Sequence, residues 1–223
     1  MKNLLRCFIK RTYSINAVAL LVAVSLLGDH LVSRIHQKHA VKAICDNSTH
    51  FLIGGISWLI VCINTSFLQN HTQCLLEILL CAFIAAVIDV DHFISAKSLS
   101  LKEATILKGR PFLHSSTVPV VICACFFMCD CLLKSAVLKR LSPIIFIAFS
   151  SHHIRDATRR GLWFSPFGST IPIPYKLYIS LNCVIPLVTF PTKPFHSGDF
   201  SSIYSSHRII IDQSGKLMVL NKD

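Results

Sequence analysis

Apolar residues recur along the chain in six long runs that are separated by short polar connections. The runs lie at 15–32, 51–68, 75–94, 117–138, 141–154 and 176–190. A helix needs roughly 20 apolar residues to cross the ~30 Å hydrocarbon layer of a bilayer, and several of these runs approach or reach that length. The pattern therefore predicts an all-α fold, a multi-pass transmembrane helical bundle of about five or six helices.

The same pattern divides the chain into a basic N-terminal segment at 1–14, a membrane helical domain at 15–190 and a short polar C-terminal tail at 191–223. A basic segment before an apolar run also fits a signal peptide or presequence, but no small-residue cleavage site follows, which favours an uncleaved helix. Within the run 141–154, Pro143 suits a helix first turn, and Arg140 is expected to reach the membrane surface. In the tail, Ser214 and Gly215 separate two short apolar stretches and predict a hairpin.

Composition supports an integral membrane protein whose main partner is the lipid bilayer. Hydrophobic residues make up 52% of the chain and charged residues 15%, which lies outside the usual range of soluble domains. The net charge of +11 would suggest nucleic acid in a soluble protein. Here the basic residues fall in the connections, where they contact anionic lipid and set orientation, so we expect no nucleic acid partner. The endoplasmic reticulum or another intracellular membrane is the expected location, and the sequence identifies no protein partner.

Histidines and aspartates cluster where the apolar runs begin or end. His50 precedes the second run, Asp89, Asp91 and His92 close the third, His114 precedes the fourth, and His152, His153 and Asp156 close the fifth. Ionisable groups at membrane depth cost about 2.5 to 3.5 kcal/mol each and therefore often mark function. If the second to fifth helices cross alternately, the four clusters share one membrane face. Lysines and arginines gather in the connections on that face, so the positive-inside rule makes it cytosolic.

Local spacing supports a converging site. His152 and Asp156 are four residues apart and Asp89 and His92 three apart, so each pair shares a helical face. Asp91 is expected to point elsewhere or toward a neighbouring helix. A mixture of imidazole and carboxylate suits a divalent metal such as Zn, Mn or Fe with an open position for water. The alternative is that these residues are ordinary caps and headgroup contacts at helix ends, and the spacing leaves both interpretations open.

Four short motifs occur in a familiar order. They are Thr49-His50, Asp89-Val90-Asp91-His92, Arg110 with His114-Ser115, and Ser151-His152 with Asp156. Together they resemble the LexA-regulated, membrane-bound metal-dependent hydrolase family of bacterial inner membranes, over about 49–166. The resemblance implies six metal ligands, which are His50, Asp89, Asp91, His114, His152 and Asp156. It further implies that Arg110 binds an anionic group such as phosphate, with His92 and His153 as ligands or as donors that orient them.

The chain departs from the family pattern at one expected ligand. The third motif of the family reads His-Arg-Gly-x-x-His-Ser, and here Gly109 replaces the first histidine and Pro111 the glycine. Enzymatic activity is therefore left open by the sequence. The alternatives are a metal-dependent hydrolase at the cytosolic face and a non-catalytic membrane scaffold or interaction protein that kept the helical frame. A transporter or proton relay is disfavoured because no inverted repeat is visible.

Overall fold

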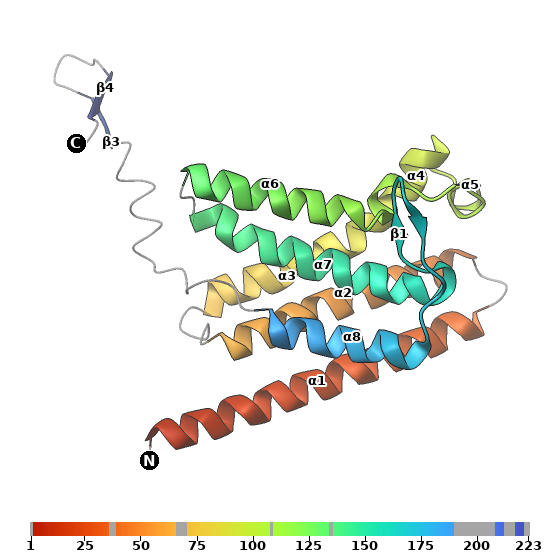
Figure 1. Ribbon diagram of the computed structural model, residues 1–223, viewed down its shortest axis with the longest axis horizontal. Helices are drawn as coiled ribbons and strands as arrows, with labels where there is room; N and C mark the ends of the chain where they lie inside the picture. The colour runs from red at the N-terminus through yellow and green to blue at the C-terminus, as the bar shows by residue number, and fades with distance from the viewer. Residues whose placement is uncertain are drawn as a thin grey trace. The chain divides into compact units, whose positions relative to one another are not determined.

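The computed structural model describes residues 2–35, 39–65, 71–107, 109–133, 136–189, 208–211 and 217–220. The chain divides into two units, Met1–Thr192 and Lys193–Asp223. Within the described residues, the first unit contains six long helices (Figure 1): α1 Lys2–Arg34, α2 His39–Asn64, α3 His71–Val87, α6 Thr117–Leu133, α7 Ala136–Arg160 and α8 Tyr175–Val188. The expectation of a mostly helical fold is confirmed. The division of the chain at residues 14 and 190 stays a prediction, and α1 itself begins at Lys2.

Two short antiparallel hairpins accompany the helices. β1 Trp163–Phe164 pairs with β2 Gly168–Ser169, and β3 Arg208–Ile211 pairs with β4 Leu217–Leu220. The second pair confirms the hairpin predicted in the tail, although the turn residues that predicted it lie outside the described part of the chain. The fold is thus mostly helical rather than strictly all-α.

Helices α2 and α7 lie at the centre of the first unit. Each of them packs against α3, α8 and the other, while α1 packs on α2 and α6 packs on α7. Small residues let the helices approach closely, which is the usual basis of helix association in lipid. A Cβ added at Gly54 would lie 2.7 Å from the Cβ of Ala85, so α2 and α3 meet almost backbone to backbone. The largest core cluster joins Trp58, Val61, Cys62, Cys74, Cys81, Ala85, Ile144, Ile147 and Ala148.

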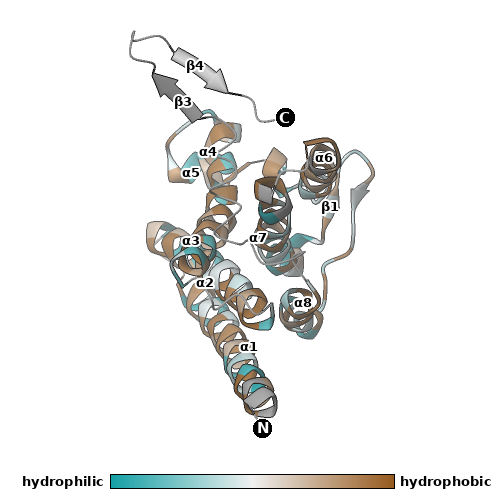
Figure 2. Cartoon of the chain, turned by 90° about the vertical axis from the view of Figure 1, so that its left-hand side faces the viewer, coloured by the Kyte–Doolittle hydropathy of each residue, from teal (hydrophilic) through white to brown (hydrophobic). Residues whose placement is uncertain are grey.

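Most residues of the long helices are apolar, which Figure 2 draws in brown, and large apolar side chains are exposed on the outside of the bundle. Phe83 on α3 and Phe127 on α6 are 61% and 66% exposed. Two helical stretches, Cys7–Arg34 and His71–Ala96, are long and apolar enough to cross a membrane, and α6 and α8 are shorter apolar helices. Exposed apolar surface of this extent suits contact with lipid. The number of crossings, five or six, stays a prediction.

Two helix boundaries differ from the expected ones, and the first difference affects the polar residues at the end of the third run. The third run is not one helix, because α3 ends at Val87 and is followed by a 3₁₀ turn, η2 Ile88–Val90, and a short helix, α4 Asp91–Ala96. The fifth helix begins earlier than expected, so Pro143 lies inside α7 and not in its first turn. Proline at that point removes one backbone N–H from the helix. Beyond α4 come α5 Leu101–Thr105 and a second 3₁₀ turn, η3 Phe112–His114.

The expectation that Arg140 reaches the membrane surface is wrong. Arg140 is buried and donates from Nε and Nη2 to the two carboxylate oxygens of Glu77, at 2.8 Å each. Trp58 Nε1 donates to the same carboxylate at 3.1 Å. The reason is that Glu77 provides a charged partner inside the bundle, which a buried arginine requires. This contact joins α2, α3 and α7 near the start of α3, whereas the polar clusters lie beyond its end.

Candidate metal centre

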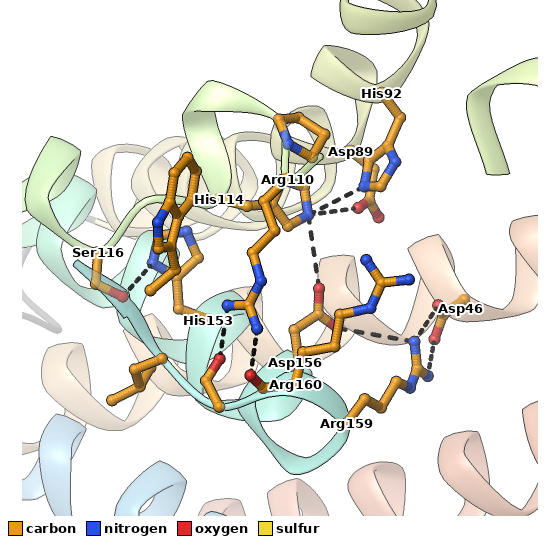
Figure 3. Close-up of a pocket in the computed structure, with 14 residues that line it drawn as sticks. Asp46, Asp89, His92, Arg110, His114, Ser116, His153, Asp156, Arg159 and Arg160 are labelled. Carbon is orange, nitrogen blue, oxygen red and sulfur yellow. Dashed lines mark hydrogen bonds and ion pairs between the residues drawn. The ribbon is translucent and has the colours of Figure 1, made fainter. Parts of the chain in front are cut away.

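The end of the bundle where α3 and α7 finish brings together all the residues that the four motifs singled out. α2 supplies His50, η2 supplies Asp89, α4 supplies Asp91 and His92, η3 supplies His114, and α7 supplies His152, His153 and Asp156. Figure 3 shows His114 between Asp89 and His92 on one side and Asp156 on the other. These elements meet because α3 and α7 end on the side where α2 and α6 begin.

Four donor atoms form the centre of this cluster. His114 Nε2 lies 3.4 Å from Asp89 Oδ1, 3.6 Å from Asp156 Oδ2 and 3.3 Å from His152 Nε2. His152 Nε2 lies 3.6 Å from Asp89 Oδ1 and 3.5 Å from Asp156 Oδ2. Ligand atoms ~2.1 Å from a tetrahedral ion are ~3.4 Å from one another. Five of the six donor separations therefore match the edges of a tetrahedral site, and the sixth is within 4.8 Å.

Backbone carbonyls set the direction in which two imidazoles face. His152 Nδ1 lies 2.8 Å from the carbonyl oxygen of Ala85, and His92 Nδ1 lies 3.1 Å from that of Ala104. A carbonyl only accepts, so in each case Nδ1 donates and Nε2 is the nitrogen that faces the cluster. His92 Nε2 lies 3.4 Å from His114 Nε2. His92 thus stands as a further donor at the edge of the four-atom centre.

Asp91 contacts the opposite edge of the His114 ring. Its Oδ1 lies 3.1 Å from His114 Nδ1, and its Oδ2 accepts the Leu113 N–H at 2.7 Å. Asp91 therefore points to a neighbouring segment, η3, which is one of the two directions expected of it. Asp89, Asp91 and His92 all reach His114. A carboxylate on Nδ1 holds the imidazole so that Nε2 faces the centre, as metal-binding histidines generally require.

His50 and His153 support the cluster in different ways. The His50 ring stacks on His152 with centroids 3.8 Å apart, and its Nε2 lies 3.5 Å from Asp156 Oδ1. It therefore contacts the carboxylate oxygen that does not belong to the four-atom centre. His153 donates from Nε2 to the Leu113 carbonyl at 2.9 Å, and its Nδ1 lies 3.3 Å from Ser116 Oγ. Both ring nitrogens of His153 are thus engaged with the segment that leads into α6.

The centre attracts positive charge. Burial by itself lowers the pKa of His114, but hydrogen bonds with Asp156, Asp89 and Asp91 outweigh burial and raise the pKa to about 11. A proton on His114 therefore neutralises part of the negative charge of three carboxylates. A metal cation would neutralise the same charge in its place. Two imidazole nitrogens and two carboxylate oxygens are donors that zinc, manganese and iron accept. The side chains present therefore fit a divalent metal.

Comparison with known proteins shows the family. The Danio rerio protein named transmembrane protein 267 is 37% identical over 205 residues, 90% of each chain. Its Bos taurus counterpart is 40% identical over 179 residues, 80% of each chain. The chain belongs to the transmembrane protein 267 family. The Xenopus laevis member is 42% identical over 155 residues, 69% of this chain and 70% of that one. The family name and the two long apolar helices support a membrane protein.

No family model and no solved structure matches the chain. The resemblance to membrane-bound metal-dependent hydrolases therefore has no support from these comparisons, and it rests on the four motifs alone.

A network of arginine and aspartate side chains joins α1, α2 and α7 beside this centre. Arg155, 1% exposed, contacts Asp29 of α1 at 2.9 Å and Asp46 of α2 at 2.7 Å. Arg159 donates from both Nη atoms to Asp46, at 3.0 and 3.1 Å. The sequence did not predict this network. The only available signal was Asp29, a charge near the end of the first apolar run.

Arg110 lines a pocket that opens beside the metal centre. Its Nη1 donates to the Gly161 carbonyl at 2.9 Å and its Nη2 to the Arg160 carbonyl. These hydrogen bonds connect the segment before η3 with the end of α7. Gly161 has φ +72°, and a Cβ there would lie 2.0 Å from the Thr170 carbonyl oxygen. The pocket has a volume of about 200 Å³ and is lined also by Asp89, His92, His114, Asp156, Arg159, Arg160 and Trp163, among others. The predicted contact of Arg110 with an anionic group stays a prediction.

Proposed function

We propose that this chain is a membrane-embedded, metal-dependent hydrolase that acts at the cytosolic membrane face. The observation that carries the proposal is the set of five donor separations between 3.3 and 3.6 Å among His114, His152, Asp89 and Asp156. These donors come from three separate elements, so their convergence is a property of the whole bundle and not of a single helix end. Residues that only cap helix ends would not need to converge in this way.

In this proposal Asp89, His114, His152 and Asp156 hold a divalent metal, which is Zn, Mn or Fe. Asp91 orients His114, and the Ala85 carbonyl orients His152. A divalent ion at such a position lowers the pKa of bound water and polarises the oxygen of an ester or amide. The pocket of about 200 Å³ beside the donors leaves room for water and the reacting group of a substrate. Arg110 on its wall is the residue assigned to bind an anionic substrate group.

Two neighbouring histidines provide a matched test of the metal centre. We expect full-length protein, purified in detergent, to contain one divalent metal per chain by elemental analysis. His152→Gln should lose that metal, because it removes Nε2 from the four donors. His153→Gln should retain it, because both nitrogens of His153 are engaged elsewhere. The proposal would be refuted if the wild-type protein stayed metal-free after incubation with Zn, Mn and Fe in turn. It would also be refuted if both variants lost the metal equally.

The second candidate function is a non-catalytic membrane scaffold or interaction protein. It is favoured by Gly109, which stands where the resembling family has a histidine. The polar cluster also forms an ion network by itself, since His114 contacts three carboxylates. This candidate requires that Asp89→Asn and His152→Gln leave the cellular role intact at normal protein level. Loss of that role in both variants would exclude it.

We also propose that α1, α2, α3, α6 and α7 cross the membrane. The 14 residues of α8 extend only about 21 Å, so α8 crosses partly or not at all. The basic connections beside the metal centre assign that side to the cytosol by the positive-inside rule. The connection between α2 and α3 then lies in the lumen of an intracellular membrane such as the endoplasmic reticulum. The sequon at Asn70 lies in that connection, outside the described residues. Glycan on Asn70 supports this orientation, and glycan on Asn47 contradicts it.

A further inference from the structure

An apolar pocket lies directly beside the polar pocket of the metal centre. It has a volume of about 530 Å³, within the range of about 300 to 1,000 Å³ that is typical of ligand sites. Its walls come from the start of α2, from η2 and α4, and from α5. Asp46, Asp89 and His92 line both pockets, so the apolar space continues into the polar one. The apolar wall consists of Ala40, Ala43, Ile44, Val90, Phe93, Leu99, Leu101 and Ala104.

Exposed apolar side chains surround this region. Ile94 is 71% exposed, Leu99 93%, Ile106 64% and Phe112 71%, and all four belong to the segment that joins the end of α3 to the start of α6. The segment lies at the end of the membrane helices, where apolar side chains enter the boundary between headgroups and acyl chains. The apolar pocket is therefore placed to receive a molecule from the bilayer rather than from bulk water.

The charged side chains of the polar pocket determine which chemical group the other end of that molecule carries. Three aspartates, Asp46, Asp89 and Asp156, face three arginines, Arg110, Arg159 and Arg160, along its lining. With a divalent ion on the four donors, positive charge exceeds negative charge in this pocket. Guanidinium groups and a divalent ion together match a phosphate group better than a neutral or zwitterionic one.

We propose, resting on the hydrolase function above, that the substrate is a phosphate ester of a lipid. Its phosphate enters the polar pocket and one acyl chain lies in the apolar pocket between α2, α4 and α5. In the reaction the oxygen of water forms a bond to phosphorus, and the bond between phosphorus and the lipid oxygen breaks. One water proton passes to the departing lipid oxygen and the other stays on the phosphate, so the products are a lipid alcohol and inorganic phosphate.

Photo-crosslinking tests this assignment without depending on turnover. The full-length protein is placed in phosphatidylcholine nanodiscs with a phosphatidic acid that carries a diazirine on one acyl chain. After irradiation, mass spectrometry should find adducts concentrated in 39–47 and 90–105. Unlabelled phosphatidic acid should compete for this labelling. Glycerol 3-phosphate should not, because it lacks the chain that fills the apolar pocket.

Two variants narrow the apolar pocket, and one matched variant does not. Ala43→Phe, on the pocket wall, should reduce specific labelling about tenfold, equivalent to about 1.4 kcal/mol of binding. Ala40→Phe, which is on the exposed part of the wall, should act in the same direction and tests the pocket should Ala43→Phe fold poorly. Val121→Phe adds the same aromatic ring to the exposed face of α6 and should label like wild type.

The outcomes separate this inference from the hydrolase proposal. Even labelling along all membrane helices, or equal labelling by a phosphatidylcholine probe, shows ordinary boundary lipid and overturns the lipid phosphate assignment, even if the protein holds its metal. Specific labelling that persists in the metal-free His152→Gln variant supports the lipid site by itself, and the hydrolase proposal is then decided by elemental analysis. Competition by glycerol 3-phosphate as strong as that by phosphatidic acid also overturns the assignment, since it indicates a soluble phosphate ester.

Discussion

Replacing Asp91 with asparagine distinguishes a ligand from a residue that orients one. The family resemblance makes Asp91 a metal ligand, whereas the geometry places it behind His114, 3.1 Å from Nδ1 and with the other oxygen on the Leu113 N–H at 2.7 Å. Asparagine has one acceptor oxygen in place of two and no charge. It therefore cannot hold both groups, but it leaves all four donor atoms of the proposed centre in place.

The expected effect is a weakened metal site and not a lost one. A hydrogen bond to a charged group contributes about 1.5 to 3 kcal/mol. Partners that orient metal-binding histidines typically contribute about 10- to 100-fold in affinity, and such a change equals about 1.4 to 2.8 kcal/mol. The two ranges agree, so we expect the metal dissociation constant of Asp91→Asn to rise about 10- to 100-fold.

Competition with a fluorescent chelator, at fixed pH in detergent, measures this constant. Glu103→Gln is the control, because it removes a nearby negative charge from an exposed position on α5 without touching His114. An Asp91→Asn protein that binds no metal even at saturation would show that Asp91 is itself a ligand. An unchanged constant, or an equal rise in Glu103→Gln, would show that the contact with His114 does not position the ring.

Three further predictions follow from the packing around the centre. Arg155→Met should destabilise the protein by about 1.5 to 3 kcal/mol, because it removes the charged hydrogen bonds of a buried guanidinium to Asp29 and Asp46. Arg159→Met, at a 49% exposed side chain, should cost at most about 1 kcal/mol. Thermal unfolding in detergent compares the two variants, and equal losses would contradict the network. Gly109→His should fold normally, because a Cβ there meets nothing within 4 Å. Tighter metal binding by this variant would mean that a histidine at this position of the motif can still reach the metal. Gly161→Ala should lower the unfolding temperature, because its Cβ would lie 2.0 Å from the Thr170 carbonyl at a positive φ; an unchanged temperature would mean that the end of α7 can move.

Much of the fold followed from the sequence because lipid imposes simple requirements. Long apolar runs in lipid favour helices, since a helix satisfies its own backbone in hydrocarbon, and each of the six runs lies mostly within one of the six long helices. Alternation along the bundle was enough to bring His50, Asp89, His114 and His152 to one end. The i,i+4 spacing of His152 and Asp156 was also sufficient to place both side chains at the centre, where they lie 3.5 Å apart.

The roles within the cluster were decided only by the tertiary structure. Which nitrogen of an imidazole faces the centre depends on carbonyls from other segments, such as Ala85 for His152 and Ala104 for His92, and one sequence does not reveal such pairs. The 3₁₀ turn at Asp89 likewise lies where η2 and α4 contact η3, and there Asp91 reaches His114. Apolar periodicity determines where helices lie, because burial depends on averages over many residues. The chemistry of a site depends on single atoms, which are positioned by packing between segments far apart in the chain.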